Sequence, residues 1–509
     1  MNSRTIAKNS FWYGIETFTN LLLSFFTSIV VARTIGPEKL GYFLYIWWIA
    51  GVAGMVGSLG IPAATRKYMS EYFGRGQMGI ARTVFYNTLR LQTAIAAVAV
   101  VSSLVLIWFF GDRQYRLMSL FMLASIFPFM VNSVVAGANA ALEDLRANVP
   151  ASMVSTGIFV LAVGLSIHFG WNLLGISIGL FTMRTAELIV RIIPMIRRLN
   201  AHSPEPLDQV LSKRMFLFSG QSLVLLLLGL IVWDRSEMIF LKNFCTDIRQ
   251  VAFYSVAFNM TERLLIFSQI FGTATEATVM AQYGRDSGRS GDLISASVRY
   301  LALISFPVHL GLAAIATPVM WAIYGNKYAG AVPALMVAAC LGVPKAFLLP
   351  VQALLASWER QDLIIRWGLV SGALNLALDF GLIPRYGAVG AAFANGIAQT
   401  FSVFAFWVVA VRLVKVRVPI WPLVKIALIS VAMASLVHLI TLRVAPVPAI
   451  LLAVSLGPAV YIVLLRMTGV LDPTDHRRML NMKNHVPRRF EGVLEASLNW
   501  LIPSPASGD

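Results

Sequence analysis

Apolar residues run through this chain in segments of about 20, and short polar stretches between them carry most of the charge. An apolar segment of about that length is typical of a helix that crosses a membrane. The pattern predicts fourteen transmembrane helices, with kinks at Pro128 in the fourth and Pro344 in the tenth. They lie near residues 10–32, 40–62, 84–110, 118–141, 151–169, 173–196, 215–233, 250–280, 298–323, 332–356, 364–383, 388–411, 419–441 and 447–466.

The segment 371–396 has the most distinctive pattern. It opens as an apolar helix in which Ser371, Asn375 and Asp379 follow one another at intervals of four, so they share one helix face. After a turn at residues 384–387 comes a helix rich in Gly and Ala, residues that let membrane helices pack closely. The segment predicts a helical hairpin with one polar stripe and one close-packed arm.

The composition supports this interpretation. The 509 residues are 58% hydrophobic and 13% charged, which is too apolar for a soluble protein of this length. The strict alternation of a transmembrane β-barrel is absent. The fold class is therefore an all-α polytopic membrane protein. The first apolar run follows Arg4 and Lys8, as in a signal peptide, but it continues to Val31 with Glu16 inside it. We expect it to remain as the first membrane span.

The net charge of +17 is explained by membrane topology without a nucleic-acid partner. If the N-terminus is cytoplasmic, 26 of the 41 Lys and Arg residues fall on the cytoplasmic side and 10 on the other, and the remaining 5 fall deeper within spans. The 26 include four residues at the cytoplasmic ends of spans, Arg299, Arg366, Lys425 and Arg466. This bias predicts an even number of spans, with both termini in the cytoplasm. Twelve spans would satisfy the bias as well as fourteen.

The sequence lacks the motifs that are typical of redox, metal and nucleotide chemistry. Cys245 and Cys340 are far apart, and no paired histidine motif or phosphate-binding glycine loop is present. We therefore predict no catalytic residue, no metal site and no bound cofactor. The loops on the outer side are all short, so no extramembrane domain is available for catalysis.

An internal repeat divides the chain. Ala64-Thr65 and a later Tyr-Phe-Gly-Arg at 72–75 are matched by Ala277-Thr278 and Tyr-Gly-Arg at 283–285. The match predicts two pseudo-symmetric six-helix lobes related by an axis along the membrane normal, with a cavity between them. The expected lobes are residues 1–200 and 201–415, followed by two further helices within 416–467. A basic tail, 468–509, should form an amphipathic helix on the inner leaflet or stay partly disordered.

Polar residues inside the spans are candidate functional groups, since an ionised side chain at mid-membrane costs about 2.5–3.5 kcal/mol. The candidates for lining a substrate cavity are Asn20, Asn259, Arg263, Lys345 and Asn375. The candidates for ion coupling or internal ion pairs are Glu16, Asp234, Arg235, Glu262, Glu276 and Asp379.

Two of these residues have alternative roles. The Arg263 guanidinium can donate two parallel hydrogen bonds to a phosphate, or it can pair with Glu262, Asp234 or Glu16 to hold helices together. Asp379 can face a cavity or lie at the membrane interface, because Pro384 follows closely. The mixture of acidic and basic groups favours a water-accessible cavity for a polar substrate.

Three segments resemble a known family. Residues 375–392 (NLALDFGLIPRYGAVGAA), 31–43 (VARTIGPEKLGYF) and the pair 233–240 and 251–257 (WDRSEMIF, VAFYSVA) are similar to motifs of Wzx-type polysaccharide transporters. These transporters belong to the MOP superfamily, together with lipid II flippases and MATE exporters. The resemblance covers about residues 8–467, and its motifs are loose but occur in the family's order.

The resemblance implies a V-shaped transporter with two lobes. It would flip an undecaprenyl-pyrophosphate-linked oligosaccharide from the inner to the outer leaflet of the bacterial inner membrane by alternating access, coupled to H⁺, Na⁺ or the membrane potential. A polysaccharide polymerase and a chain-length regulator would be partners. Arg263 corresponds in position to a cation expected in such a cavity. The acidic residues of this chain depart from a purely cationic cavity.

Other functions remain as alternatives. A MATE-like drug or cation antiporter and a lipid II-type flippase share the expected architecture. A polymerase or ligase of the same pathway would need a large outer loop, and a glycosyltransferase would need a nucleotide- or metal-binding element. The chain shows neither feature.

Overall fold

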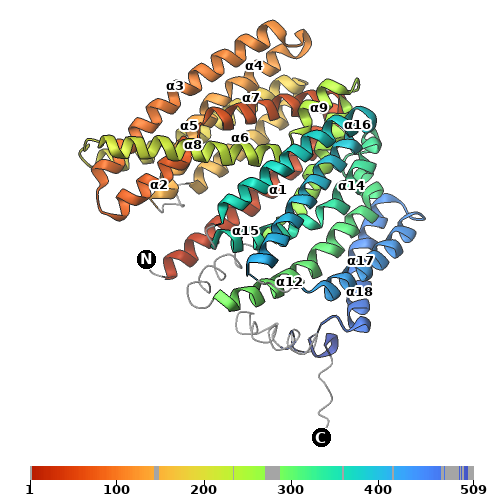
Figure 1. Cartoon of the computed structure of the whole chain (residues 1–509). Coiled ribbons are helices and arrows are strands. Elements are labelled where there is room, and N and C mark those ends of the chain that lie inside the picture. Colours follow the sequence, from red (N-terminus) through yellow and green to blue (C-terminus); the bar gives the residue numbers. More distant parts are fainter. Residues whose placement is uncertain are drawn as a thin grey trace. The chain divides into compact units, whose positions relative to one another are not determined.

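The computed structural model is helical throughout the part of the chain that it describes (Figure 1). This part comprises residues 3–142, 148–232, 234–266, 268–269, 287–357, 360–414 and 418–471, with a few positions of the tail. Side chains are described from Leu21 onward. Within these residues there is no β-strand, which confirms the predicted all-α class.

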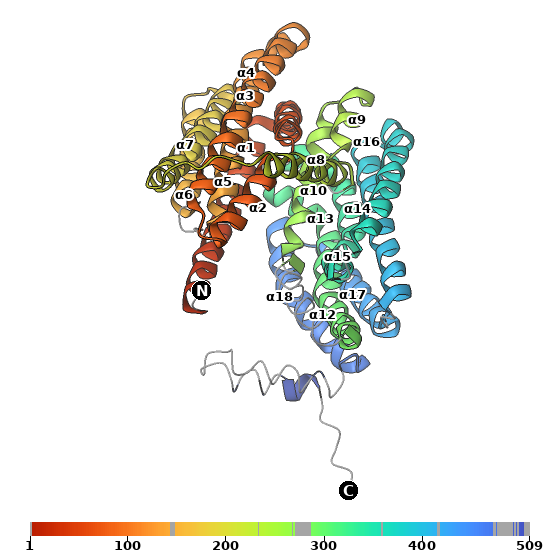
Figure 2. The same ribbon diagram turned by 60° about the vertical axis from the view of Figure 1, so that its left-hand side comes forward.

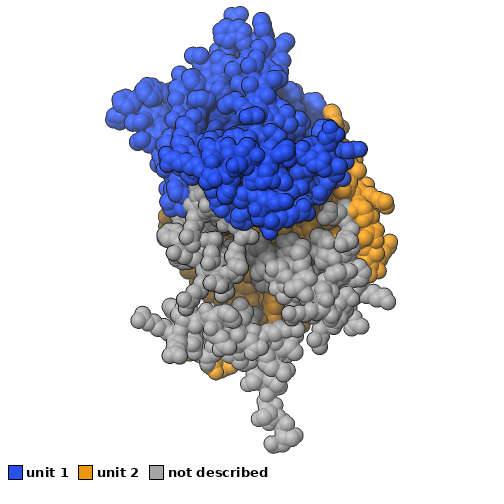
Figure 3. Space-filling model, turned by 90° about the vertical axis from the view of Figure 1, so that its left-hand side faces the viewer, with its two compact units in different colours: residues 1–252 blue, residues 253–509 orange. Residues whose placement is uncertain are grey.

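The helices fall into two compact units, Met1–Ala252 and Phe253–Asp509 (Figure 3). The first holds α1 (Ser3–Gly57), α2 (Ile61–Gly74), α3 (Met78–Phe110), α4 (Arg116–Ala124), α5 (Ile126–Ala141), α6 (Asn148–His168), α7 (Asn172–Asn200), α8 (Gln209–Val232) and α9 (Glu237–Phe244). The division lies inside α10 (Arg249–Leu264). The second unit continues with α12 (Ser287–Ala314), α13 (Ala316–Ile323), α14 (Val332–Gly342), α15 (Leu348–Ser357), α16 (Gln361–Val414), α17 (Ile420–Thr441) and α18 (Pro446–Thr468).

Eleven helical segments among the described residues are long and apolar enough to cross a membrane. Two of them each contain two helices joined at a glycine with positive φ, α1 at Gly36 and α16 at Gly387. Counted separately, these helices raise the number to thirteen. The eighth expected span is described as helix α10, and the rest of it lies outside the described residues. Each of the fourteen predicted spans thus has a helix at its place.

The two kinks predicted from proline are also present. The fourth span breaks at Ser125, three residues before Pro128, where α4 ends and α5 begins. In the tenth span α14 ends at Gly342, and a short 3₁₀ helix, η4 (Pro344–Phe347), separates it from α15. Proline removes an amide donor and obstructs the preceding turn, so both breaks have the same physical cause.

Loops of the first unit meet in two groups. At one end, the Thr83 hydroxyl donates to the Glu205 carbonyl over 2.6 Å, joining the start of α3 to the loop before α8. At the other end, Tyr42 stacks on Tyr115 with ring centres 4.4 Å apart. Gly41 packs there against the Ile248 carbonyl so closely that a Cβ atom would collide with it. Loops predicted on the same side of the membrane are therefore neighbours, as the predicted order of spans requires.

The last two spans of the second unit, α17 and α18, pack against α12. Helices α12, α14, α17 and α18 run alongside one another in Figures 1 and 2, and α12, α17 and α18 share a buried apolar cluster. The Tyr461 hydroxyl of α18 donates to the Leu303 carbonyl of α12 over 2.9 Å. The carboxylate of Asp475, in the tail, is fully buried and pairs with Arg299.

A short part of the predicted amphipathic tail is described. Leu498 and Ile502 are buried, and Leu501 packs against the cluster shared by α12, α17 and α18. These apolar side chains therefore contact the protein itself. Phe490, Val493 and Leu494, which share the helical spacing of Leu498 and Leu501, lie outside the described residues.

Candidate functional site

The polar stripe predicted on the first arm of α16 lies inside the protein. The side chains of Ser371, Asn375 and Asp379 are all fully buried. The Asn375 amide donates to an oxygen of the Asp379 carboxylate one turn later, over 3.3 Å. The Asp379 carboxylate is therefore enclosed by protein in this conformation. A carboxylate in such surroundings is costly without a function or a compensating interaction.

The second arm of α16 is close-packed, as predicted. Gly387 has φ 53° and ψ −127°, a conformation that glycine adopts without the penalty of a Cβ atom. Ala388, Ala391 and Ala394 beyond it are buried. At Gly390 a Cβ atom would collide with the Leu382 carbonyl, so the two arms touch directly where the chain reverses. This hairpin holds the polar stripe on a rigid support.

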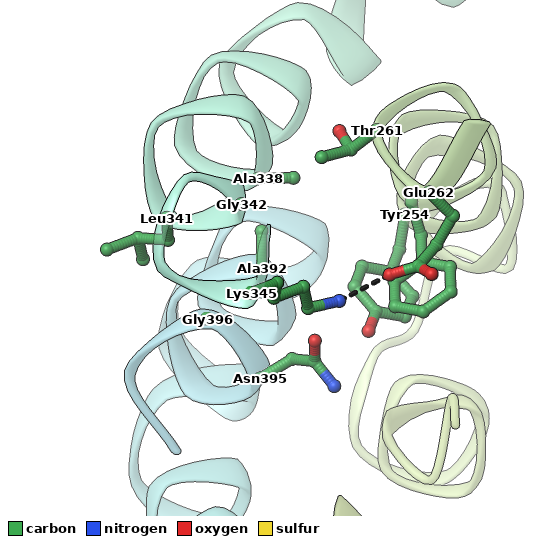
Figure 4. Close-up of a pocket in the computed structure, with 11 residues that line it drawn as sticks. Tyr254, Thr261, Glu262, Ala338, Leu341, Gly342, Lys345, Ala392, Asn395 and Gly396 are labelled. Carbon is green, nitrogen blue, oxygen red and sulfur yellow. Dashed lines mark hydrogen bonds and ion pairs between the residues drawn. The ribbon is translucent and has the colours of Figure 1, made fainter. Parts of the chain in front are cut away.

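An ion pair crosses the second unit near this hairpin. Lys345, in the 3₁₀ segment η4, pairs with the Glu262 carboxylate of α10 (Figure 4). The Lys345 side chain is 9% exposed and the Glu262 side chain 33%. The Lys345 ammonium also lies 4.8 Å from the centre of the Phe258 ring, on the same face of α10. Both charged residues were candidates from the sequence, but their pairing was not predicted.

The pair borders a small pocket. Its lining comes from three elements: Tyr254, Phe258, Thr261 and Glu262 of α10, Ala338, Leu341, Gly342 and Lys345 of α14 and η4, and Ala392, Asn395 and Gly396 of α16. Figure 4 shows Asn395 below the Lys345 ammonium and Glu262 opposite it. Its accessible volume, about 20 Å³, is room for about one water molecule. In this conformation the pocket is therefore too small for a larger ligand beside the ion pair.

Arg263 and Asn259 lie on a neighbouring face of α10. Successive residues of a helix point about 100° apart, so Arg263 does not share the face of Glu262. Both side chains are partly buried, and neither lines the pocket around Lys345. Glu262, one of the expected pairing partners of Arg263, is engaged with Lys345.

Several candidates belong to the first unit or lie outside the described residues. Asp234 and Arg235 follow α8, and the Arg235 amide donates to the Asp234 carboxylate over 2.8 Å. Their charged groups are 3.8 Å apart and partly exposed. The side chains of Glu16, Asn20 and Glu276 lie outside the described residues.

The first unit contains a second ion pair within its spans. Glu187 pairs with Arg191 one turn later on α7, over 3.0 Å, and Arg191 also donates to the Asn132 amide oxygen of α5 over 3.2 Å. Arg184 lies over the Phe129 ring, 4.4 Å from its centre. Arg184 precedes Glu187 by three residues and is attracted to it electrostatically, but the ion pair of Glu187 is formed with Arg191. The i, i+4 spacing of Glu187 and Arg191 brings their charges together on one helix face.

No group of three or more His, Cys, Asp or Glu side chains gathers as a metal site in the part of the chain that the structure describes. Sequence reasoning also missed Asn395 and Tyr254, which line the pocket. Asn395 had a local signal, since it is a polar residue in an arm otherwise rich in Gly and Ala. Tyr254 had none, because an aromatic residue in an apolar helix is usually part of the core.

Comparison with known proteins identifies a protein family and two similar proteins. The model of the family "Polysaccharide biosynthesis protein" matches residues 6–280, more than half of the chain. The "Probable low-salt glycan biosynthesis flippase Agl15" of Haloferax volcanii is 20% identical over 400 residues, 77% of this chain and 81% of that protein. The "Teichuronic acid biosynthesis protein TuaB" of Bacillus subtilis is 31% identical over 114 residues, about a fifth of each chain.

Solved structures show the same fold. The lipid II flippase MurJ in an inward closed conformation has a TM-score of 0.72 at 15% identity, covering 90% of this chain and 98% of that one. An inward-facing MATE multidrug transporter of the MOP superfamily has a TM-score of 0.66 at 13% identity, covering 77% and 94%. At these identities the likeness concerns the fold alone, and it confirms the MOP-type architecture.

Proposed function

The chain belongs to the polysaccharide biosynthesis protein family, and we propose that it is a flippase that carries a lipid-linked glycan across the membrane by alternating access. The observation that carries the proposal is the ion pair between Lys345 and Glu262, held inside the membrane by a proline-broken helix in a chain of this family. A transporter of polar head groups needs such groups within its spans. An apolar core would not provide them.

The proposed substrate is an undecaprenyl-pyrophosphate-linked oligosaccharide. Its head group is anionic, and the Lys345 ammonium is a strong donor to phosphate oxygens. In this conformation the Glu262 carboxylate is paired with this ammonium. A pyrophosphate that entered the site would compete with the Glu262 carboxylate and release η4 from α10. Binding would thereby be linked to the opening of the second unit.

Arg263 is proposed as a second cation for the head group. It lies one position beyond Glu262, on an adjoining face of α10. Both cations would approach a head group that displaces Glu262, which requires the adjoining face of α10 to turn toward the site. Asn259 and Asn375 are proposed as polar contacts to sugar or phosphate. Asn20 is assigned the same role from its place in the first span.

Asp379 is proposed as the group that couples transport to H⁺ or Na⁺. Its carboxylate is fully buried and accepts a hydrogen bond from Asn375, so protonation or cation binding would change the charge of the hairpin. Glu16, Asp234, Arg235 and Glu276 remain candidates for coupling or internal pairing. We propose no other cofactor and no enzymatic step.

The proposed location is the bacterial inner membrane, with both termini in the cytoplasm. The excess of Lys and Arg in the loops of one side supports this orientation. A polymerase and a chain-length regulator of the same pathway are proposed to use the flipped product.

The proposal is tested by deleting the gene in the cell that produces the protein. The flippase predicts that a lipid-linked oligosaccharide accumulates on the cytoplasmic leaflet and that surface polysaccharide is lost. Re-expression of the wild-type chain should reverse both effects. Unchanged surface glycan, together with new sensitivity to organic cations, would instead favour a MATE-like antiporter. Accumulation of lipid II would identify a peptidoglycan-precursor flippase.

A further inference from the structure

The first unit contains a polar pocket of about 460 Å³ that the transport mechanism above does not use. Its lining comes from two segments, the start of the second arm of α1 and the connection from α9 to α10. The lining residues are Glu38, Tyr42, Lys242, Cys245, Thr246, Asp247, Ile248 and Arg249. The volume lies in the range of pockets that bind small organic molecules, about 300–1,000 Å³.

The pocket is firmly built. Gly41 lies against the Ile248 carbonyl with no room for a side chain, which fixes the α9–α10 connection on α1. Met238 and Leu241 of α9 are fully buried and anchor the other end of the same segment. The Tyr42 ring stacks on Tyr115 and lies 5.0 Å from the Lys242 ammonium. The walls on both sides of the pocket are therefore held by packing.

Its hydrogen-bonding groups are also held in place. The Arg249 guanidinium is bonded to both oxygens of the Asp247 carboxylate, over 2.9 and 3.0 Å. The Arg249 amide donates to the same carboxylate over 2.9 Å. A ligand therefore meets donors and acceptors whose positions are already set, which reduces the entropy lost on binding.

The chemistry of the lining selects a class of ligand. Two carboxylates (Glu38, Asp247) face two cations (Lys242, Arg249), so a strongly charged ligand of either sign would meet repulsion as well as attraction. Ile248 is the one aliphatic side chain of the lining, which disfavours an apolar ligand. A neutral molecule with many hydroxyl groups suits it, because each hydroxyl both donates and accepts hydrogen bonds.

The pocket can also be assigned to one side of the membrane. It lies where loops 33–39 and 234–249 meet, and Tyr115 of the loop after α3 packs at its edge. All three loops are odd-numbered in the predicted order of spans and thus lie on the outer side in the proposed orientation. A sugar chain that has crossed the membrane would reach this side.

We propose that this pocket binds neutral sugar residues of the glycan on the outer face of the protein, after the head group has crossed. This inference rests on the proposed function, since it takes its ligand from the flipped substrate. The pocket would hold part of the glycan while the lipid leaves, and so would bias transport toward export.

Cys245 offers a direct test, because it lines the pocket and the chain has one other cysteine. In the C340A variant, Cys245 is the sole thiol, and its labelling by a maleimide can be followed in the purified, reconstituted full-length protein. Burial and the nearby Asp247 raise the pKa of the Cys245 thiol, so the labelling is done at alkaline pH. The probes are short oligosaccharides from partial acid hydrolysis of the surface polysaccharide of the producing cell.

The proposal predicts that these oligosaccharides slow the labelling at least five-fold and saturably, whereas pyrophosphate and spermidine do not. The protection should be lost when Glu38→Ala or Lys242→Ala is added. Lys39→Ala is the matched control, since Lys39 neighbours Glu38 but does not line the pocket. Unchanged labelling with the oligosaccharides, stronger protection by a charged probe, or full protection in the Glu38 and Lys242 variants would overturn the proposal.

Two further readouts separate this inference from the proposed function. An impermeant maleimide should label Cys245 in intact cells, and labelling only after lysis would place the pocket on the cytoplasmic side and overturn the inference. The deletion strain tests the flippase independently. If the protein flips the glycan normally but oligosaccharides do not protect Cys245, the outer sugar site is refuted and the flippase function is not affected. Protection without flipping would leave a sugar site on a protein of another function.

Discussion

Two ion pairs inside the membrane spans differ in what they connect. The pair of Glu187 and Arg191 lies within one turn of α7 and is completed by Asn132 of α5. The pair of Lys345 and Glu262 joins η4 to α10, two elements 83 positions apart in sequence. Similar charges are buried in both, since Arg191 and Lys345 are each 9% exposed. The charges of the first pair move together with their helix, whereas the second pair must break when its elements separate.

This difference assigns different roles to similar chemistry. A pair within one helix neutralises charge and contributes to stability without limiting motion. A pair that links a helix to a proline-broken segment can act as a closing contact that a substrate replaces. Removing one partner of each pair should therefore affect transport in one case and stability in the other.

The largest effect is expected for Lys345→Met. This change removes the ammonium proposed to bind the head group and leaves Glu262 without its partner, so surface glycan should fall at least ten-fold at unchanged membrane levels. Quantitative detection of surface polysaccharide and of the membrane-bound protein measures both. The double variant Glu262→Lys with Lys345→Glu keeps the pair and is the control. Normal export in Lys345→Met would show that the pair is a structural contact only.

Arg263→Ala should abolish most transport while leaving the protein in the membrane. The same export assay measures it, with Arg263→Lys as the variant that keeps the charge but loses the two parallel hydrogen bonds. A cation that binds the head group predicts partial export in Arg263→Lys. Full export in Arg263→Ala would leave this residue outside the site.

Asp379→Asn should weaken transport several-fold, less than Arg263→Ala. The amide keeps the volume and the hydrogen bond to Asn375 but cannot change its charge, so transport should lose its dependence on the coupling ion. Uptake into vesicles at varied Na⁺ and pH detects this loss. An undiminished ion dependence in Asp379→Asn would exclude Asp379 as the coupling group.

Arg191→Met should act on stability. The effect is expected to be roughly 1–3 kcal/mol, below the range for an uncompensated buried charge, because Arg184 lies one turn before Glu187. Thermal unfolding in detergent should fall by several degrees, while transport per molecule stays unchanged. A loss of transport at normal stability would make the pair in α7 part of the mechanism and would remove the contrast with Lys345.

The smallest effect is expected for the exposed pair of Asp247 and Arg249. Burial is the largest single influence on the pKa of Asp247 and raises it, but the side-chain and backbone hydrogen bonds from Arg249 and its positive charge together outweigh burial and lower this pKa below its ordinary value. The pair therefore stabilises the loop at neutral pH, and this contribution is lost as the pH falls through the lowered pKa. Arg249→Leu should lower the melting temperature slightly at pH 7, and the difference should vanish in acid. A difference in melting temperature between the wild type and Arg249→Leu that grew in acid would contradict the stabilising role of the pair.

Features encoded by local spacing were predicted from the sequence. The shared face of Ser371, Asn375 and Asp379 follows from their intervals of four, and the breaks near Pro128 and Pro344 follow from proline itself. The close packing at Gly390 follows from the run of small residues. These patterns involve one helix or two adjacent helices, where the geometry is fixed by the backbone.

Long-range pairing could not be derived in the same way. Glu262 and Lys345 were both identified, but several cations and carboxylates inside the spans could have paired, and only packing selects among them. Asn395 and Tyr254 line the pocket because α10, α14 and α16 meet there.

The central claim is that Lys345 belongs to a site through which a lipid-linked glycan crosses the membrane. It is tested most directly by reconstituting the purified protein in liposomes that contain the lipid-linked oligosaccharide. A membrane-impermeant glycosidase then measures how fast the glycan moves between leaflets. The account predicts flipping by the wild type and by the charge-swapped pair, and at least ten-fold slower flipping by Lys345→Met. Equal rates for all three proteins, or no flipping above protein-free liposomes, would contradict it.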